Sequence, residues 1–326
     1  MTTLVIGAGL VGSQIARVLA EAGEMPVLMD PAAQPDAIAE VVALDRVRMI
    51  KGDVLRPLDI TRAILDHAIT DIVHTAANPL LTLGAQRDPF SAIQLNIMGA
   101  VNVFEAARAH KLRRVVTSSS TVLNHYMEGG EGRSSMLKEE AFPRPMTFYA
   151  ATKQAVESLG LNYARWCGVD FAAMRYGAVC GPWRGRGGGG PSNMFLGVVE
   201  RALSGEEVEV PASDMEWVYS KDAARGTVLA LRAPNLGSRI FNLSMGCITT
   251  PDDFAAALRR AIPEARIRLQ RVEEVDVSMR KQDTVSDPAL SRQVLGFTPE
   301  YGIHEAVADM ARWLRANRPT AVSHAP

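Results

Sequence analysis

The chain has 326 residues, with 35 basic and 36 acidic side chains and a formal net charge of −1. At about 150 residues per domain, this length predicts two lobes or one large α/β unit. Hydrophobic residues make up 47% of the chain and charged residues 22%, which excludes disorder for most of its length. The balanced charge gives no electrostatic reason to expect a nucleic acid or an anionic membrane as partner.

The cysteines are few and far apart. Cys167, Cys180 and Cys247 are an odd number and form no Cys-x-x-Cys pair, which argues against a disulfide framework and a structural zinc site, so no metal is expected. There is no run of 18 apolar residues, and the N-terminal residues show no basic leader region. The expected location is the reducing cytoplasm.

The first 120 residues alternate short β-branched runs with longer helical patterns, which is typical of βαβ units. The predicted strands are residues 4–6, 26–29, 47–50, 71–74, 114–117 and 171–174. The predicted helices are residues 10–22, 89–110, 149–166, 194–203, 248–263 and 303–317. Residues 184–191 (RGRGGGGP) form the one low-complexity patch, predicted to be a mobile loop. The pattern predicts an α/β fold with a doubly wound parallel sheet of Rossmann type and a smaller C-terminal lobe.

A glycine-rich sequence, Gly7-Ala8-Gly9-Leu10-Val11-Gly12, lies between the first predicted strand and helix. Glycine lets a pyrophosphate approach the backbone, and the helix N-terminus offers it free N–H groups. Asp30 follows 18 residues beyond Gly12, at the end of the second strand. A carboxylate there accepts the ribose hydroxyls and repels a 2′-phosphate, and no Lys or Arg follows directly, so NAD is predicted rather than NADP. The alternative is a glycine turn with Asp30 as a solvated loop acid.

Tyr149 and Lys153 lie four residues apart, which places them on one face of a helix. An ammonium group beside a phenol lowers the phenol pKa from about 10 toward neutrality, as a general acid–base requires. The serine run Ser118-Ser119-Ser120 ends the fifth predicted strand, and ligands bind at the carboxyl ends of parallel strands. The pattern therefore predicts a serine–tyrosine–lysine site.

Together with further segments, these motifs resemble the extended short-chain dehydrogenase/reductase superfamily, specifically the NAD-dependent epimerase/dehydratase family. The further segments are Gly52-Asp53-Val54, His74-Thr75-Ala76-Ala77, residues 95–103 around Asn96, residues 175–182 and residues 217–224. The resemblance covers nearly the whole chain. It implies an NAD-binding Rossmann domain with the catalytic residues over 1–176 and mainly a substrate-binding lobe over 177–318, from which some segments return to the sheet domain. A disordered tail is expected over 319–326.

The resemblance also implies the role of each site residue. Tyr149 is expected to be the general acid–base, and Lys153 is expected to lower the pKa of Tyr149 and hold the nicotinamide ribose. Ser120 is the expected catalytic hydroxyl, with Ser119 as the near alternative. The implied NAD-binding residues are Gly7, Gly9, Leu10, Val11, Gly12, Asp30, Asp53, Val54, Ala76, Ala77, Asn96, Ser118, Tyr149, Lys153, Tyr176 and Val179. The expected substrate-binding residues are Asn78, Ser120, Thr121, Asn124, Arg184 and Asn193.

Some of these assignments have a simpler alternative. Asp53 could be a turn carboxylate, and His74 is expected to pack under the sheet rather than act as a base. Arg184 and Arg186 are candidates to close over an anionic substrate such as a carboxylate, and the alternative is an exposed flexible loop.

The sequence departs from the family pattern next to the predicted site. The Val-Tyr-Gly of the family is Leu123-Asn124-His125 here, the asparagine of the RYxNVYGP segment is Ala178, and the arginine before the FVYVDD segment is Met215. The last two positions commonly grip the substrate diphosphate in nucleotide-sugar enzymes. Losing those donors disfavours a nucleoside-diphosphate sugar.

The predicted function is an NAD-dependent oxidoreductase that transfers a hydride between NAD and a secondary alcohol or ketone of a small polyhydroxylated or hydroxy-acid substrate. The alternative is a sugar epimerase or dehydratase, acting on a nucleotide sugar or a free sugar, that keeps its NAD. A non-catalytic NAD-sensing regulator is the third reading, and the retained tyrosine–lysine pair argues against it. The resemblance further implies a homodimer through the two long helices, 89–110 and 149–166.

Overall fold

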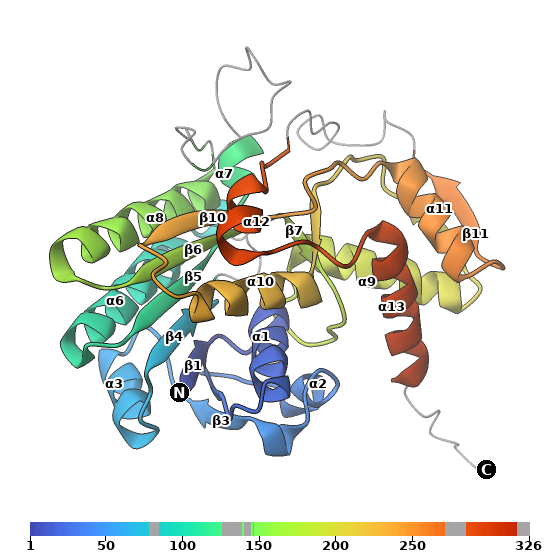
Figure 1. Cartoon of the computed structure of the whole chain (residues 1–326). Helices are drawn as coiled ribbons and strands as arrows, with labels where there is room; N and C mark the ends of the chain where they lie inside the picture. Colours follow the sequence, from blue (N-terminus) through green and yellow to red (C-terminus); the bar gives the residue numbers. More distant parts are fainter. Residues whose placement is uncertain (78–84, 126–138, 140–144, 146, 271–284, 318–326) are drawn as a thin grey trace, which may run out of the picture.

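We describe a computed structural model of the chain, in which residues 1–77, 85–125, 139, 145, 147–270 and 285–317 are described. Its centre is a seven-stranded sheet in which every neighbouring pair of strands is parallel, in the order β10-β6-β5-β4-β1-β2-β3 (Figure 1). The strands are β1 Thr3–Ile6, β2 Val27–Asp30, β3 Arg48–Lys51, β4 Asp71–His74, β5 Arg114–Ser120, β6 Phe171–Tyr176 and β10 Arg239–Leu243. The first six follow the strand order of the Rossmann fold, so the predicted α/β class is confirmed.

Helices cover both faces of the sheet, because successive side chains of its buried strands point to opposite sides. On one face lie α1 (Leu10–Glu21), α10 (Ser220–Arg232) and α12 (Ala289–Leu295), which share a core with Val5, Leu28, Val73 and Val116. On the other face lie α3 (Pro57–Asp66), α6 (Gly99–His110) and α8 (Phe148–Cys167), which share a core with Leu4, Ile6, Ile72 and Val115. Of these elements, α3, α10, α12 and β10 were not predicted.

The smaller C-terminal lobe has its own apolar core. Its helices are α9 Gly189–Leu203, α11 Pro251–Ala261 and α13 Ile303–Ala316, and its strands pair as β8 (Glu207–Val210) with β11 (Arg266–Leu269) and β7 (Ala178–Cys180) with β9 (Trp217–Tyr219). In Figure 1 these helices stand beside the sheet domain. The glycine patch is less loop-like than predicted: α9 begins at Gly189, so the last three residues of the patch are helical.

The remaining elements are short connections. They are α2 Pro35–Ala39, a 3₁₀ turn Leu44–Arg46, α5 Pro89–Ile93, a π-helical turn Gln94–Met98 and α7 Val122–His125. The predicted single helix 89–110 is therefore α5, the π turn and α6 in succession. In the described part of the chain no helix is long and apolar enough to cross a bilayer. No group of three or more His, Cys, Asp or Glu side chains among the described residues could hold a metal ion.

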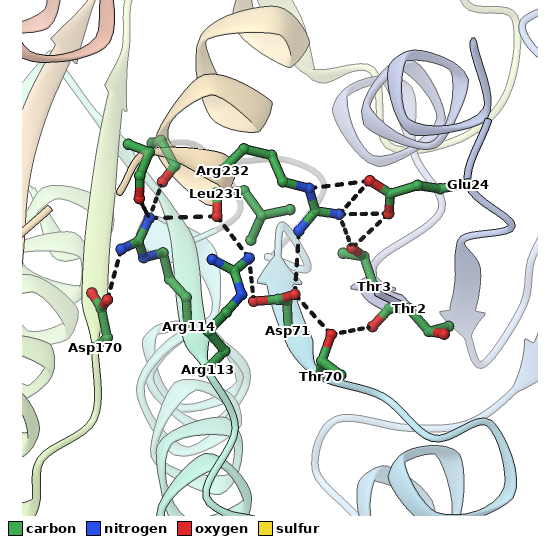
Figure 2. A network of polar contacts seen from close by, with 12 residues as sticks. Thr2, Thr3, Glu24, Thr70, Asp71, Arg113, Arg114, Asp170, Leu231 and Arg232 are labelled. Atoms are coloured by element: carbon green, nitrogen blue, oxygen red, sulfur yellow. Dashed lines mark hydrogen bonds and ion pairs between the residues drawn. The ribbon is translucent and has the colours of Figure 1, made fainter. Parts of the chain in front are cut away.

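A network of charged side chains lies at the amino-terminal edge of the sheet (Figure 2). Asp71, fully buried at the start of β4, contacts Arg113 at 2.7 Å and Arg232 of α10 at 3.2 Å. Arg232 also pairs with Glu24, which follows α1. The network joins β4, the start of β5, α10 and the end of α1 at the edge opposite the carboxyl ends of the strands, where a parallel sheet places its ligands.

Candidate active site

The phosphate-binding loop has a backbone that only glycine fits. Gly7 has a φ of +98°, and a Cβ on it would lie 2.7 Å from the backbone nitrogen of Ala76. A Cβ on Gly12 would lie 1.8 Å from the carbonyl oxygen of Gly7. The loop therefore folds tightly between β1 and α1, which leaves the α1 N-terminus open to an anionic group.

Asp30 lies beside this loop at the end of β2. Its carboxylate accepts a hydrogen bond from the Ala8 backbone nitrogen at 3.0 Å and from that of Ala32 at 2.8 Å. The acid is thereby fixed next to the glycine turn. Its position fits the adenosine ribose of a dinucleotide, and its negative charge opposes a 2′-phosphate.

Other residues predicted to bind the cofactor lie at the neighbouring strand ends. The Asp53 carboxylate accepts a hydrogen bond from the Leu55 backbone nitrogen, and Val54 is buried. Ala76 contacts Gly7, and Ala77 is half-buried directly after it. The observed hydrogen bond of Asp53 is that of a turn carboxylate, which was the alternative interpretation. Its contact with the cofactor stays a prediction.

The serine, tyrosine and lysine come together where β5 meets the start of α8. Thr147 caps α8 by accepting a hydrogen bond from the Ala150 backbone nitrogen. The Tyr149 side chain lies beside Ser120, whose hydroxyl accepts a hydrogen bond from the Val122 backbone nitrogen at 3.2 Å. Lys153 Nζ donates to the Ser118 carbonyl oxygen at 3.0 Å and lies 3.3 Å from Ser118 Oγ. Both Tyr149 and Lys153 are buried, which shields their polar groups from bulk water.

The structure distinguishes Ser120 from the alternative Ser119. The Ser119 hydroxyl donates to Glu157 Oε1 at 2.6 Å, so it is engaged away from the tyrosine. Ser120 is the serine that lies beside Tyr149.

The expected lowering of the Tyr149 pKa is wrong for this pocket. Burial raises the pKa of Tyr149 to about 12, and its hydrogen bond with Ser120 opposes this rise only in part. The Lys153 ammonium does not reverse the shift, because it donates to Ser118 and lies 5.6 Å from the centre of the Tyr149 ring. Burial also lowers the pKa of Lys153 to about 8, against the charge of Glu157. At neutral pH the tyrosine is therefore a proton donor.

His74 is buried under the sheet, as expected. Burial, with the charge of Lys153, lowers the pKa of His74 to about 3. Its imidazole is therefore neutral across the physiological range.

Asn96 and Tyr176 are both tied into the protein. Asn96 Nδ2 donates to Thr152 Oγ1 at 2.9 Å from the π-helical turn, and the Thr152 hydroxyl donates to the Tyr149 carbonyl oxygen. The Tyr176 hydroxyl is hydrogen-bonded with Thr227 at 2.6 Å. Asn96 therefore supports the first turn of α8, and the Tyr176 hydroxyl is engaged within the protein.

The predicted substrate residues are dispersed. Asn78 lies outside the described residues, and Asn124 lies in α7 with a side chain outside the description. Thr121 is buried, with its backbone nitrogen bonded to the Tyr176 carbonyl oxygen, and Asn193 is exposed on α9. Val179, predicted for the cofactor, is half-buried in β7.

Arg184 is engaged away from the catalytic residues. Its guanidinium donates to the Asn317 carbonyl oxygen at 2.6 Å and stacks 4.9 Å from the Trp313 ring. It also lies 3.5 Å from Glu40 and 3.6 Å from Glu200. Arg184 thus joins the C-terminal lobe to the segment after α2, and we leave it out of the proposed substrate site.

The glycine patch itself lies against the phosphate-binding loop. A Cβ on Gly9 would lie 3.3 Å from the Gly187 carbonyl oxygen. Trp183 holds the turn, because its ring is buried and its indole nitrogen donates to the Arg186 carbonyl oxygen at 2.9 Å. Arg186, the other predicted lid residue, is exposed.

Sequence reasoning missed a buried ion pair one helical turn beyond Lys153. Glu157 accepts hydrogen bonds from Arg175 Nε at 2.8 Å and Nη2 at 2.7 Å. The available signal was spacing, since Glu157 follows Lys153 by four residues as Lys153 follows Tyr149.

A parallel sheet with a glycine-rich turn, an acid at the end of β2 and a serine–tyrosine–lysine set is typical of a dinucleotide-dependent enzyme of the short-chain dehydrogenase/reductase type. The model of the NAD dependent epimerase/dehydratase family matches residues 3–244. The chain belongs to this family and is an NAD-dependent enzyme, as predicted.

Similar proteins include both sugar epimerases and an amino-acid dehydrogenase. The UDP-glucose 4-epimerase of Corynebacterium glutamicum is 27% identical over 90% of this chain and 89% of its own length. The structure of the Thermus thermophilus UDP-glucose 4-epimerase with NAD has a TM-score of 0.79 and 25% identity over 97% of this chain and all of its own. A partial-consensus L-threonine 3-dehydrogenase has a TM-score of 0.82 and 25% identity, with 97% of this chain and 100% of its own covered.

Proposed function

We propose that the protein is an NAD-dependent oxidoreductase that transfers a hydride between NAD and a secondary alcohol or ketone of a small polyhydroxylated or hydroxy-acid substrate. The observation that carries the proposal is that half-buried Ser120 lies beside buried Tyr149 at the carboxyl end of β5, with buried Lys153 one helical turn further along α8. A carbonyl or hydroxyl oxygen bound there would meet two hydroxyl groups at once. Such an arrangement can hold the oxygen and exchange its proton.

Each of the three residues has a chemical role in this proposal. Tyr149 gives its proton to the carbonyl oxygen in the reducing direction and removes it from the alcohol in the oxidising direction. Ser120 holds the same oxygen, and Lys153 holds the nicotinamide ribose and contributes a positive charge. Bound NAD supplies the hydride acceptor and a positively charged ring, which favours ionisation of the nearby Tyr149.

Two apolar positions support a small substrate over a nucleoside-diphosphate sugar. Ala178 and Met215 stand where nucleotide-sugar members of the family commonly grip the diphosphate, and neither side chain can donate a hydrogen bond. Met215 also borders a cavity of about 10 Å³ whose other walls include Trp217 and Phe254. Neither Ala178 nor Met215 offers a charge or a hydrogen bond to a phosphate, so these two substitutions favour a substrate without a diphosphate.

The test is the absorbance at 340 nm of purified protein supplied with NAD and a panel of sugars, polyols and hydroxy acids. The proposal expects NADH to accumulate with at least one secondary alcohol and NAD to exchange freely. Absence of NADH formation over the whole panel, in protein that binds NAD, would refute it.

The alternative is an NAD-retaining epimerase or dehydratase, which the similarity to UDP-glucose 4-epimerase over 90% of this chain favours. Such an enzyme returns the hydride to the same molecule, so no NADH accumulates. Stoichiometric NAD that copurifies and does not exchange would support this alternative, and nucleotide sugars are then the substrates to test.

We further propose a homodimer through the helices around α5 and α8. Large apolar side chains are exposed on these elements: Phe90, Ile93, Met98, Phe148, Leu161 and Trp166. Trp166 is 74% exposed, an unusual position for a tryptophan unless a partner covers it. Light scattering should give twice the chain mass for the native protein and a shift toward the single-chain mass for Trp166→Glu. A monomer at micromolar concentration would refute the proposal.

A further inference from the structure

Three consecutive serines of β5 each contact one residue on a single stripe of α8. The pairs are Ser118 with Lys153, Ser119 with Glu157 and Ser120 with Tyr149. The three α8 residues follow one another at intervals of four, about one helical turn. The reaction proposed above uses the first and second of these positions on the helix and leaves the third, Glu157, without a role.

Glu157 ties the catalytic helix to two strands. It is 3% exposed, and Ser119 donates to its carboxylate at 2.6 Å. Arg175 of β6, which is 2% exposed and pairs in register with Ser119, binds both of its oxygens. One carboxylate therefore fixes α8, β5 and β6 at the level of the catalytic serines.

Glu157 also acts on Lys153 through its charge. Burial lowers the pKa of Lys153 to about 8, and the negative charge of Glu157 opposes that fall. Burial lowers the pKa of His74 to about 3, so His74 brings no positive charge near the lysine at neutral pH. Arg175 brings one, which the carboxylate of Glu157 meets directly.

Two other groups of charged side chains on the elements that pack around α8 have partners of their own. Glu105 of α6 accepts hydrogen bonds from Tyr163 and Arg108 toward the far end of the helix. Arg114 at the start of β5 pairs with Asp170 at 2.7 Å. Among the described side chains, Glu157 is thus the anion that balances the catalytic lysine.

We propose that Glu157 is a positioning residue, which keeps Lys153 in its charged form and holds the serine run of β5 against α8. The proposal rests on the proposed function, in which Lys153 acts as the cation of the site. Glu157 is in this proposal an internal counter-ion shared between Lys153 and the buried Arg175.

The decisive experiment is the pH dependence of turnover and of NAD affinity for Glu157→Gln. Activity and NAD binding that need the protonated Lys153 decline as the pH rises through its pKa. Glutamine keeps the shape and a hydrogen-bond acceptor but removes the charge, and it leaves Arg175 positive. The alkaline decline should then move down by roughly one to two pH units.

Matched variants separate charge from packing. Ser119→Ala removes the hydrogen bond but not the charge, so its alkaline decline should stay with that of the wild type. Glu157→Asp should restore most of the wild-type profile. In Lys153→Arg the alkaline decline of NAD affinity should vanish, because a guanidinium stays charged throughout this range.

A double variant, Glu157→Gln with Arg175→Met, covers the case in which Glu157→Gln alone does not fold, because it removes the unpaired buried cation as well. Its alkaline decline should lie between those of Glu157→Gln and the wild type. The proposal would be overturned if the alkaline decline coincided with that of the wild type in every folded variant lacking Glu157. It would also be overturned if the alkaline decline shifted as far in Ser119→Ala as in Glu157→Gln. The pH dependence of NAD affinity, measured by calorimetry, tests the role of Glu157 even if no alcohol in the panel is oxidised. Failure to oxidise any alcohol would refute only the proposed function.

Discussion

Asp71 at the amino-terminal edge of the sheet provides a direct test of how the molecule is held together away from its active site. Its carboxylate is fully buried and contacts two arginines, Arg113 at 2.7 Å and Arg232 at 3.2 Å (Figure 2). Asp71→Asn keeps the shape of the side chain and removes its charge. Both arginines then lose the anion that joins β4 to the start of β5 and to α10.

The expected cost follows from the exposure of the partners. Breaking a fully buried ion pair costs about 3–5 kcal/mol, because it leaves an uncompensated charge in the interior. Here Arg113 is 33% exposed and Arg232 is 25% exposed, and Arg232 keeps its pair with Glu24. Water and Glu24 therefore offset part of the loss, and we expect Asp71→Asn to lower the free energy of unfolding by about 2–3 kcal/mol.

The assay is equilibrium unfolding in urea, followed by circular dichroism, with NAD affinity measured on the folded variant. Glu21→Gln is the matched control, since it breaks the Arg17–Glu21 pair, in which Glu21 is 54% exposed, and should cost less than about 0.5 kcal/mol. NAD affinity should be unchanged in Asp71→Asn, because the network and the phosphate-binding loop lie at opposite edges of the sheet. A cost for Asp71→Asn no greater than that of the control would refute the reasoning.

Three further changes probe the cofactor site and the catalytic residues. Gly12→Ala should abolish NAD binding measured by calorimetry, because the new methyl group would overlap the Gly7 carbonyl oxygen. The control Gly197→Ala, with open space at its Cβ, should bind NAD normally. Equal binding by both variants would contradict the loop geometry. Asp30→Ala should weaken NAD binding by about 10- to 100-fold, the value of one or two charge-assisted hydrogen bonds, and should raise the relative affinity for NADP. An unchanged ratio of NAD affinity to NADP affinity would argue against the assigned ribose contact. Tyr149→Phe should lower turnover by about 10²- to 10⁴-fold while NAD still binds, and near-normal turnover would exclude Tyr149 as the acid–base.

The parts of this protein that were predictable from sequence depend on short-range constraints. The first six strands, the glycine turn and Asp30 can be predicted because buried strands, tight turns and strand-end acids each need particular residues at fixed spacings. The spacing of Tyr149 and Lys153 is likewise a property of one helix. These features remain readable in a single sequence.

Other features were decided only by tertiary structure. Strand alternation alone leaves open which serine meets the tyrosine, and the packing of α8 against β5 assigns Ser120 to Tyr149 and Ser119 to Glu157. The contacts of Arg184 with Trp313 and Glu40 join residues far apart in the chain, so no local pattern predicts them. β10 joins the sheet from the distant second half of the chain, where no local motif predicts a strand.

The pKa of Tyr149 shows most clearly why some properties of the site depend on tertiary structure. The sequence by itself determined that a lysine lies one helical turn from the phenol, which predicts a lowered pKa. Packing decided the outcome, because burial removes the hydration of a phenolate and raises the pKa of Tyr149 to about 12, while Lys153 donates to Ser118 instead. Burial depends on every element around the site, so it is a property of the folded chain and cannot be read from the spacing of two residues.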